Sequence, residues 1–291
     1  MRRSIGAINA DVSRPKDLAD YWLTRFPKLY LALEKRRQWL CWDRRLYLAV
    51  VQPGNIVLDI GANVGAHTVL FSHLVGREGT VLSFEPVPDN VTRLRATVAR
   101  RSRSDNVTIR ELAVGHPRST REQITLTAPG DDLTQASMAI QTAGSWEHGT
   151  GVRRYSATLT SIDTELAATP LSRLDFVKID VEGAELDVLR GGANTIARFQ
   201  PLIYAEVFAD WTRSFGYSPA DLFEYIRAAG YTDARVIRGE LATALPLDGI
   251  GSVPDFDVSS NVLFFGDRHR ALVQRFDRLF DVQTRFKRNG D

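Results

Sequence analysis

From residue 53 onward, short apolar runs alternate with longer segments in which apolar residues recur at helical spacing. The apolar runs end at glycine, proline or acidic residues and predict strands. Strands are expected at 55–60, 80–84, 107–112, 174–180, 202–207, 232–237 and 261–265. Helices are expected between them at 64–75, 88–101, 184–189, 193–198 and 219–229. This alternation predicts an α/β fold with a mostly parallel sheet covered by helices on both faces.

The alternation is interrupted after the third predicted strand. Residues 120–127 and 153–159 predict the two strands of a hairpin, joined by the polar, glycine-rich segment 129–151. A loop of this length inside a domain is usually mobile or functional. We expect a mobile loop here, which either lacks fixed structure or closes as a lid over a ligand. The lid candidates in it are Ser137, Met138, Ser145, Trp146 and His148.

Both ends of the chain read as additions to the central fold. Residues 1–52 contain apolar residues at helical spacing and predict an N-terminal helical cap. Residues 53–267 form the predicted catalytic domain. Residues 268–291 alternate arginine with leucine, valine and phenylalanine, which predicts a basic amphipathic helical tail. Its default interpretation is a terminal helix docked on the domain.

Composition narrows the function classes. The formal net charge of the 291 residues is +2, so the total charge gives no reason to expect a nucleic-acid partner. The single cysteine, Cys41, excludes an internal disulfide and a cysteine-cluster metal site. The N-terminus lacks the apolar core of a signal peptide, and no apolar run has the length of a membrane span. We expect a cytoplasmic protein without a membrane span, and a homo-oligomer is one of the assembly states we consider.

The segment 59–65, Asp-Ile-Gly-Ala-Asn-Val-Gly, is the most informative in the chain. Gly61 and Gly65 allow the backbone to approach a ligand closely where a strand gives way to a helix. A nicotinamide-dinucleotide site requires the spacing Gly-x-Gly-x-x-Gly, which is absent. Asp59 would also repel a pyrophosphate. The carboxylate suits a cation without phosphate, such as S-adenosylmethionine; the same glycines would also serve packing alone.

A second acidic residue favours the ligand-binding interpretation. Glu85 follows the second predicted strand about 20 residues after the glycines, where a carboxylate that binds ribose hydroxyls is expected. Gly61, Asn63 and Gly65 would line the methionine and ribose, with Asn63 able to adopt an unusual backbone angle. The remaining candidates for cofactor contacts are Thr68, toward the methionine carboxylate, and Asn90 and Ala113, near the ribose and adenine.

Four segments together resemble the FkbM family of S-adenosylmethionine-dependent methyltransferases. They are Asp-Ile-Gly-Ala-Asn-Val-Gly at 59–65, Phe-Glu-Pro at 84–86, Val-Lys-Ile-Asp-Val-Glu-Gly-Ala-Glu at 177–185 and Leu-Arg-Gly-Gly at 189–192. The resemblance covers roughly residues 53–266. It implies a Rossmann-like methyltransferase sheet with its last strand antiparallel beside strand 202–207. It also implies O-methylation of hydroxyls on sugars, polyketides and related natural products.

The block 177–185 supplies the candidate catalytic residues. Asp180 and Glu182 lie at the end of the fourth predicted strand, where the transferred methyl group is expected. If they share one side of the strand, their proximity raises one pKa toward useful basicity. Lys178 would act with them or form an ion pair with one of them. The alternative is a helix-capping and salt-bridge network around Gly183. His67 is a further possible base, although a packed histidine is the more common case.

A metal-assisted mechanism is a variant of this hypothesis. Asp180 and Glu206 follow neighbouring predicted strands and offer the hard oxygen ligands that magnesium prefers. No Asn or further Asp stands beside Glu206 to complete the set. We therefore predict no tightly held metal.

Three other function classes are less consistent with these segments. A methyltransferase acting on a nucleic-acid base would often carry Asn/Asp-Pro-Pro-aromatic where this chain has Asp180-Val181-Glu182-Gly183. This difference counts against a base methyltransferase. A protein or RNA substrate stays an alternative to the small-molecule hydroxyl because the N-terminal and C-terminal stretches are basic. A nicotinamide-dependent oxidoreductase is disfavoured by the glycine spacing. A binding module that holds S-adenosylmethionine without turnover is also compatible with the sequence.

Overall fold

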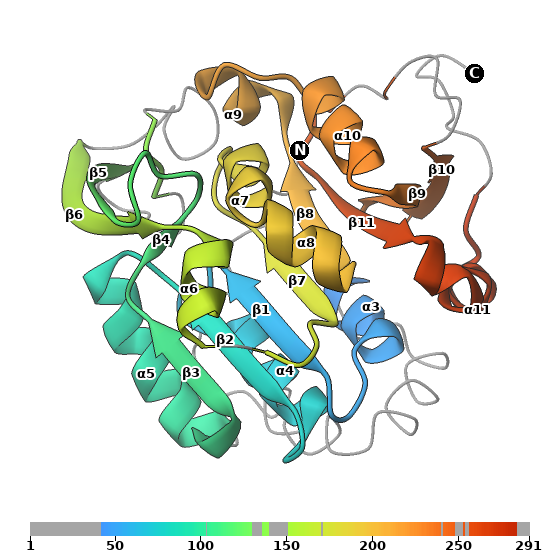
Figure 1. The fold of residues 1–291 in the computed structure, drawn as a ribbon, viewed down its shortest axis with the longest axis horizontal. Helices are drawn as coiled ribbons and strands as arrows, with labels where there is room; N and C mark the ends of the chain where they lie inside the picture. The colour runs from blue at the N-terminus through green and yellow to red at the C-terminus, as the bar shows by residue number, and fades with distance from the viewer. Residues whose placement is uncertain are drawn as a thin grey trace, which may run out of the picture.

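The computed structural model describes residues 42–102, 104–129, 136–139, 151–169, 171–239, 241–247, 253 and 256–283. Within this part of the chain, one sheet of eight strands forms the centre of the molecule, in the order β10-β9-β11-β8-β7-β1-β2-β3 (Figure 1). Its strands are β1 (Ile56–Ile60), β2 (Thr80–Phe84), β3 (Val107–Arg110), β7 (Phe176–Ile179), β8 (Leu202–Val207), β9 (Tyr231–Arg238), β10 (Leu241–Pro246) and β11 (Ser260–Gly266).

The strand directions agree with the predicted topology. The neighbouring strands β8, β7, β1, β2 and β3 pair in parallel. Strand β11 runs antiparallel to both β8 and β9 and lies between them, as the family resemblance implied. Strand β10 was not predicted; it pairs antiparallel with β9 and forms one edge of the sheet. The fold is therefore the mostly parallel, Rossmann-like methyltransferase sheet.

Helices cover both faces of the sheet (Figure 1). On one face lie α6 (Ile162–Ala168), α7 (Glu185–Gly191), α8 (Ala193–Phe199) and α10 (Pro219–Ala228). On the other lie α3 (Trp42–Val50), α4 (Ala66–Val75) and α11 (Arg270–Phe280), with α5 (Pro88–Arg101) packed beside α4 and β3. The short α9 (Ala209–Ser214) follows β8. Neither α6 nor α9 was predicted.

Each face of the sheet has its own apolar core. Beneath α3 and α4, the rings of Tyr47, Phe71, Phe176 and Tyr204 meet with centroids 4.7–6.5 Å apart, mostly edge to face. All of these side chains are at most 2% exposed. Burying an aromatic side chain of this size contributes about 1.5–3 kcal/mol. The helix α3 is thus part of the core; the rest of the predicted cap, residues 1–41, lies outside the described residues.

The C-terminal helix α11 is docked on the sheet. Phe276 stacks on Phe280 with ring centroids 4.4 Å apart and packs edge to face on Phe265 of β11. Arg235 of β9, which is 3% exposed, holds the carboxylate of Asp277 through two hydrogen bonds of 2.7 and 2.8 Å. A paired guanidinium of this kind fixes both partners in one geometry. The helix therefore buries its apolar side; residues 284–291 of the predicted tail lie outside the described residues.

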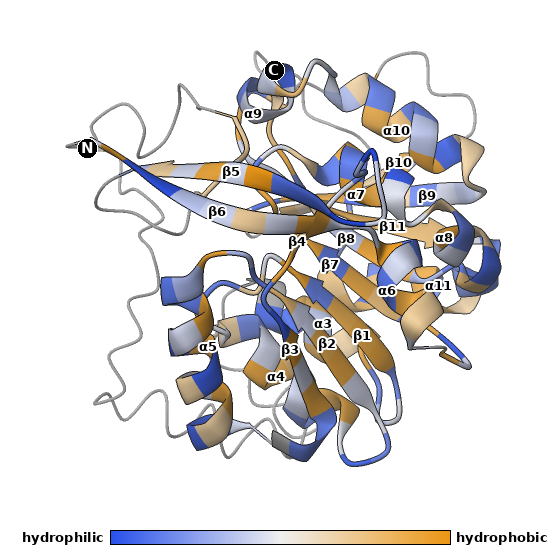
Figure 2. Cartoon of the chain, turned by 60° about the vertical axis from the view of Figure 1, so that its left-hand side comes forward, coloured by the Kyte–Doolittle hydropathy of each residue, from blue (hydrophilic) through white to orange (hydrophobic). Residues whose placement is uncertain are grey.

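A second, three-stranded sheet rises beside the first. Strands β5 (Glu122–Pro129) and β6 (Val152–Thr160) form the predicted hairpin, and β4 (Ala113–Val114) pairs with the end of β6. Figure 2 shows this hairpin as a long ribbon that extends from the main sheet. Leu126 and Ala157 pack on Val87, which follows Glu85. The hairpin is thereby attached next to the candidate cofactor site.

The long segment between the hairpin strands is described only at residues 136–139 and 151. There Ser137 forms an antiparallel bridge with Thr127 of β5. Its hydroxyl donates a 3.0 Å hydrogen bond to the backbone oxygen of Glu182. Met138 packs in the same apolar cluster as Leu126. The other lid candidates, Ser145, Trp146 and His148, lie outside the described residues.

None of the helices in the described residues combines the length and the apolar composition needed to span a bilayer.

Candidate functional site

The candidate residues converge at the carboxyl ends of four neighbouring strands. Asp59 lies in β1, Glu85 follows β2, Asp180 follows β7 and Glu206 lies near the end of β8. These strands are adjacent in the order β8-β7-β1-β2, and Asp59 is directly opposite Lys178 in the register of β1 and β7. Ligands of open α/β sheets bind at this edge. The structure therefore brings together residues that the sequence places up to 147 positions apart.

The glycine loop after β1 has the backbone geometry its residues suggest. Gly61, Asn63 and Gly65 all have positive φ angles, of 78°, 50° and 90°. A Cβ atom at Gly61 would lie 1.8 Å from the backbone oxygen of Asp180, which only glycine permits. A Cβ atom at Gly65 would lie 2.5 Å from a methyl group of Leu94 on α5. Helix α4 begins at Ala66, two residues later than predicted, because Gly65 occupies its N-cap.

Asp59 is completely buried beneath this loop. The hydroxyl of Thr68 donates a 2.6 Å hydrogen bond to its Oδ2, and the Lys178 ammonium lies 3.7 Å from its Oδ1. Burial raises the pKa of Asp59 although Lys178 and Thr68 act in the opposite direction. Thr68 is also fully buried, and its hydroxyl is directed to Asp59; its contact with the methionine carboxylate stays a prediction. Asp59 thus lies beneath the glycine loop, and the positive charge of Lys178 compensates its negative charge.

Glu85 is 4% exposed and accepts three hydrogen bonds. The donors are the backbone amides of Asn63 (2.9 Å) and Val87 (3.0 Å) and the side-chain amide of Asn90 (3.2 Å). Burial raises its pKa, and these hydrogen bonds only partly offset that effect. A carboxylate offers about four acceptor positions, so one on Oε2 remains for a ligand hydroxyl. Asn90, predicted near the ribose, orients Glu85.

Ala113 lies in another environment than the sequence suggested. The third strand of the main sheet ends at Arg110 rather than at residue 112, and Ala113 and Val114 form β4 of the second sheet. The chain turns out of the main sheet here because β4 pairs with β6 rather than continuing beside β2. Ala113 is 8% exposed. It stays a predicted cofactor neighbour, located on a strand instead of in a turn.

Lys178 lies between Asp59 of β1 and Asp180, which follows β7. Its ammonium lies 3.1 Å from Oδ2 of Asp180 and 3.7 Å from Oδ1 of Asp59, and it donates to the backbone oxygen of Gly61 at 3.2 Å. Burial lowers the pKa of Lys178, but the carboxylates of Asp180 and Asp59 outweigh burial and keep it above its ordinary value. The predicted ion pair is therefore present, and Lys178 stays charged.

His67 is a weak base in this environment. Burial and the nearby Lys178 lower the pKa of its imidazole to about 3. Its ring packs edge to face on Tyr47, with centroids 5.4 Å apart. The packed interpretation of His67 is the one the geometry favours.

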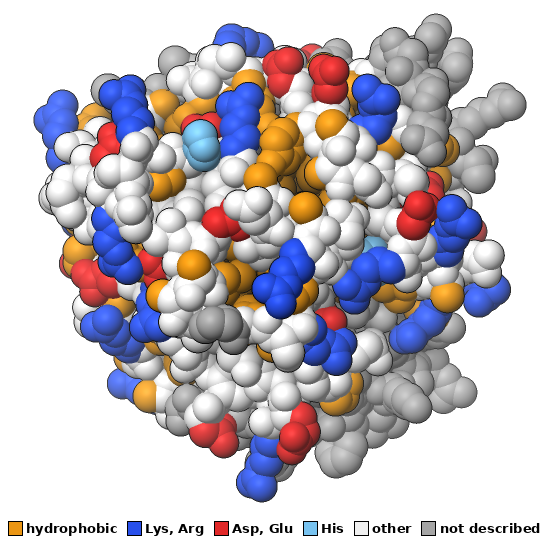
Figure 3. Space-filling view, in the orientation of Figure 1, with side chains coloured by type: hydrophobic (Ala, Val, Ile, Leu, Met, Phe, Trp, Pro, Cys, Tyr) orange, Lys and Arg blue, Asp and Glu red, His pale blue; other side chains and the backbone are white. Residues whose placement is uncertain are grey.

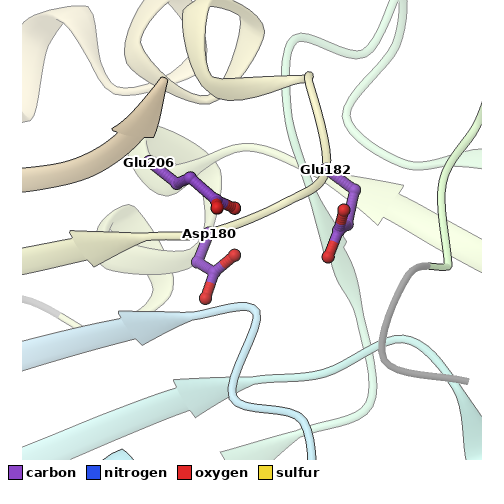
Figure 4. Close-up of side chains that lie close together, drawn as sticks. All are labelled: Asp180, Glu182 and Glu206. Atoms are coloured by element: carbon purple, nitrogen blue, oxygen red, sulfur yellow. The ribbon is translucent and has the colours of Figure 1, made fainter. Parts of the chain in front are cut away.

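Asp180, Glu182 and Glu206 form a group of carboxylates (Figure 4). One oxygen from each lies within 4.8 Å of the others. The protein environment around Asp180 favours its neutral form, but the Lys178 ammonium outweighs this and keeps its pKa low. Burial and the negative charge of Asp180 raise the pKa of Glu206, which also accepts a hydrogen bond from Ser259. Of these two carboxylates, Glu206 therefore has the higher proton affinity.

The alternation of side chains along a strand does not explain why Asp180 and Glu182 lie close together. Strand β7 ends at Ile179, and Glu182 lies in the turn beyond it with φ 58°. A left-handed backbone at a residue with a Cβ atom is strained and needs external support. That turn, rather than the pleat of a strand, directs its carboxylate toward Asp180. The prediction of a pair was right and its geometric reason was wrong.

The same three carboxylates offer the oxygen ligands that magnesium or calcium prefers. The sequence drew attention to Asp180 and Glu206 in this role, and the structure adds Glu182. Lys178 already compensates part of the negative charge at Asp180. The absence of a tightly held metal stays a prediction.

The support beneath the turn was not foreseen. Oε1 of Glu185 accepts hydrogen bonds from the backbone amides of Val181 and Gly183, both at 3.2 Å. The hydroxyl of Tyr217 lies 2.8 Å from the backbone oxygen of Gly183 and 3.2 Å from Oε2 of Glu185. This network matches part of the alternative interpretation around Gly183. Glu185 belonged to the recognised segment, whereas nothing near Tyr217 in the sequence signals the contact.

Acidic and basic side chains are mixed on one face of the molecule. Figure 3 shows lysine and arginine interspersed with aspartate and glutamate over the face drawn. This distribution accords with the formal net charge of +2.

Comparisons with known proteins agree with this geometry. The Methyltransferase FkbM domain matches residues 59–232, which contain the glycine loop, Glu85 and the carboxylate group. The chain is 25% identical over 185 residues, 64% of its length and 66% of the relative's, to the hexuronic acid methyltransferase AglP of Haloferax volcanii. Over 50 residues, 17% of this chain and 19% of the relative, it is 44% identical to the 31-O-demethyl-FK506 methyltransferase FkbM of Streptomyces tacrolimicus.

Solved structures of methyltransferases resemble the chain more distantly. Methyltransferase FkbM from Methylobacillus flagellatus KT is 17% identical, with 76% of this chain and 50% of that chain covered and a TM-score of 0.43. A SAM-dependent O-methyltransferase from Thermotoga maritima is 10% identical, with 76% and 63% covered and a TM-score of 0.42. The match of the family domain extends over more than half of the chain. The chain belongs to the FkbM methyltransferase family.

Proposed function

We propose that this protein is an S-adenosylmethionine-dependent methyltransferase that methylates a hydroxyl group of a small molecule. The observation that carries the proposal is the glycine loop at 61–65, which is held against Glu85 on one side and Asp180 on the other at the carboxyl edge of the sheet. Family membership supports the reaction class. The two curated relatives act, by their names, on a hexuronic acid and on a demethylated FK506.

The residues of the loop fit the cofactor. Asn63 directs its backbone amide to Glu85, and its own Oδ1 is buried without a hydrogen-bond partner among the described residues. A buried acceptor without a partner is costly, so a ligand donor there would be stabilising. Glu85 keeps one acceptor position, which suits a ribose hydroxyl. We infer that Gly61, Asn63, Gly65 and Glu85 contact the cofactor directly, while Asp59, Thr68 and Asn90 orient them.

The catalytic role falls to Asp180. S-adenosylmethionine, when bound, supplies a methyl group activated by a sulfonium. The chain must then hold the acceptor in line, exclude water and accept the hydroxyl proton. Asp180 is kept ionised by Lys178 and is 38% exposed, so it can receive a hydroxyl hydrogen bond. Glu206 has the higher proton affinity of the two neighbouring carboxylates, and Glu182 would be a further acceptor for the substrate.

The identity of the acceptor and the other detailed predictions stay part of the proposal. A sugar or polyketide hydroxyl is the proposed acceptor, and a macromolecular acceptor is the alternative. A homo-oligomer, a cytoplasmic location and the division at residues 53 and 267 remain predictions of the sequence. A module that binds the cofactor without turnover predicts binding but no methylated product, which makes it separable by experiment.

Titration calorimetry tests the cofactor assignment. We expect S-adenosylmethionine and S-adenosylhomocysteine to bind and NAD to give no heat. Incubation with methyl-labelled cofactor and a panel of hydroxylated sugars and polyketides should then give labelled product. Binding of NAD in place of S-adenosylmethionine would overturn the proposal. Cofactor binding with no labelled product from any acceptor would leave the binding-module alternative.

A further inference from the structure

The turn at residues 180–184 between β7 and α7 has a strained backbone at the place where the candidate catalytic residues stand. Glu182 and Gly183 have φ angles of 58° and 103°. A Cβ atom at Gly183 would lie 2.9 Å from the backbone oxygen of Trp211 and 3.0 Å from the ring of Phe215. Such a conformation persists only when surrounding contacts determine it. The question is which side chains hold it.

Glu185 lies under this turn and is 2% exposed. Its Oε1 accepts hydrogen bonds from the amides of Val181 and Gly183 at 3.2 Å, which uses both acceptor positions of that oxygen. Its Oε2 lies 3.2 Å from the hydroxyl of Tyr217. Tyr217 comes from the segment between α9 and α10, 32 positions further along the chain. The acid and the phenol thus meet directly beneath the strained residues.

The hydrogens around Tyr217 can be counted. Its hydroxyl lies 2.8 Å from the backbone oxygen of Gly183, which can only accept. The amide of Leu186 donates to the hydroxyl at 3.4 Å. A phenol has one hydrogen to give and two acceptor positions. If that hydrogen goes to Gly183, the contact between the hydroxyl and Oε2 of Glu185 needs a hydrogen from Glu185. Both close contacts of the hydroxyl then have a hydrogen, whereas with ionised Glu185 the single phenol hydrogen cannot serve both Gly183 and Glu185.

We propose that Glu185 is a neutral acid which, together with Tyr217, positions the turn that carries Asp180 and Glu182. We call the two side chains the Glu185–Tyr217 clamp. The proposal rests on the proposed function, because the turn matters for methyl transfer only if Asp180 serves there. Glu185 and Tyr217 are positioning residues and touch neither substrate nor cofactor. Loss of the proton from Glu185 releases one of the hydrogen bonds that keep Gly183 in place.

The electrostatic surroundings agree with the hydrogen count. Burial raises the pKa of Glu185 to about 7 and outweighs the hydrogen bonds from the backbone amides of Glu185, Gly183 and Val181, which lower it; the negative charge of Asp180 on the same turn adds to the rise. Glu206 at the end of β8 also faces Glu185. Burial raises the pKa of Tyr217, with Glu185 and Asp187 of α7 adding to the effect. In the described part of the chain, no ion pair joins Glu185 to a basic side chain.

The raised pKa sets the sign of the pH dependence. The folded protein binds the Glu185 proton more tightly than the unfolded chain does. The clamp therefore stabilises the fold fully below a pH of about 4.5, and this contribution is lost as the pH rises through about 7. Glu185→Gln retains the carbonyl acceptor and a donor toward Tyr217 but cannot ionise. Tyr217→Phe removes the hydroxyl and leaves the ring.

Hydrogen exchange of the amides of Val181, Gly183 and Leu186 tests the proposal in the full chain between pH 5.5 and pH 8.5. After correction for intrinsic exchange, protection in the wild type should decrease about tenfold over this range. In Glu185→Gln it should stay constant, with a melting temperature above that of the wild type at pH 8.5. In Tyr217→Phe it should be low at every pH. Glu224→Gln, an exposed acid on α10, is the matched control and should follow the wild type.

Two results would overturn the clamp. One is equal pH dependence of protection in Glu185→Gln and the wild type. The other is low protection in Glu185→Gln at every pH, since a network that needs the anion would fail with glutamine. If Tyr217→Phe does not fold, the comparison of Glu185→Gln with the wild type still decides. With a working acceptor, kcat of the wild type should decline above pH 7 while kcat of Glu185→Gln does not, with KM for the cofactor unchanged.

Cofactor binding is measured on the same samples. If none of the folded forms binds S-adenosylmethionine, the proposed function fails while the exchange data still decide whether the clamp exists. If the wild type binds S-adenosylmethionine but the protection of the three amides does not change with pH, the clamp is rejected and the proposed function is kept.

Discussion

The two ends of the site treat their carboxylates differently. At the cofactor end, Asp59 and Glu85 are held by the protein's own donors: a hydroxyl and an ammonium for the first, two backbone amides and a side-chain amide for the second. At the acceptor end, Asp180, Glu182 and Glu206 bring oxygens within 4.8 Å of one another. Lys178 lies between the two ends and contacts both.

This difference separates carboxylates whose orientation is fixed in advance from carboxylates that are available to accept a proton. A carboxylate that already accepts several hydrogen bonds has a fixed orientation and presents a defined surface to a ligand. At the other end, the negative charge of Asp180 raises the pKa of Glu206, while Lys178 keeps Asp180 ionised and able to accept a hydroxyl hydrogen bond. We infer that the cofactor end is built for positioning and the acceptor end for proton transfer. Substitutions at each end should therefore affect different measurements.

Gly61→Ala should have the largest effect because it disturbs both ends at once. The new Cβ atom would meet the backbone oxygen of Asp180 at 1.8 Å, and the residue must keep a φ of 78°. Strain and overpacking together should cost about 3 kcal/mol or more of unfolding free energy, with cofactor binding lost. Chemical denaturation and calorimetry provide the measurements.

Gly54→Ala is the matched control for that substitution. Gly54 has a φ of 81°, but no atom lies within 4 Å of its added Cβ atom. It isolates the cost of the backbone angle, about 1–2 kcal/mol. If the two variants were equally stable, the close approach of the glycine loop to the turn after β7 would be unimportant.

Asp180→Asn should separate the two ends most clearly. The amide cannot accept the hydroxyl proton, so kcat should decrease by about 10²–10⁴-fold. The cofactor dissociation constant should change by no more than about threefold, because the ligand contacts lie at the other end. Steady-state kinetics and calorimetry measure the two quantities. A parallel loss in both would assign Asp180 to cofactor positioning instead.

Asp59→Ala and Glu85→Ala should act in the opposite way. Each strands buried donors that now have a carboxylate partner, which weakens cofactor binding by about 1–3 kcal/mol, roughly 5- to 150-fold in Kd. At saturating cofactor, kcat should recover more fully than in Asp180→Asn. Unchanged affinity in both variants would remove the basis for placing the cofactor at this edge.

His67→Phe should give the smallest change and only in acid. The pKa of His67 is lowered to about 3, so the folded protein binds fewer protons than the unfolded chain. The wild type therefore loses stability as the pH falls from about 6.5 toward 3, and the variant should lose less. Melting temperatures at pH 7 and pH 5 report the difference. This pH dependence of stability has the opposite sign to the one expected for Glu185. If the melting temperatures of the wild type and His67→Phe fell equally between pH 7 and pH 5, the lowered pKa of His67 would be contradicted.

The sequence predicts the parts of this molecule that depend on local pattern. Strands β1 and β2 are apolar runs closed by glycine and proline, and their positions were predicted to within one residue. The short, polar α9 and the edge strand β10 have no such pattern, and their contacts with the rest of the fold determine them. Asp180 and Glu206 could be placed together because β7 and β8 are neighbours in this topology.

What the sequence could not reveal depends on loops that meet in space. Ser137, one of the lid candidates, and Tyr217 reach the turn at 180–184 from segments 45 and 34 positions away from the residues they contact. No periodic pattern or motif indicates which residues these two side chains contact. Thr68 was assigned to the ligand because its helix begins at the site, but its rotamer directs the hydroxyl to Asp59. Side-chain direction of this kind is set by packing.

The position of β11 has a consequence for how the chain is made. Residues 260–266 fill the space between strands formed by residues 202–207 and 231–238. During synthesis, β8 therefore cannot complete its pairing until residues 260–266 have left the ribosome. Until then, β8 presents an unpaired apolar edge, which is a hazard for aggregation. The order of translation thus places the completion of the sheet beside Glu206 after the synthesis of β1, β2 and β7.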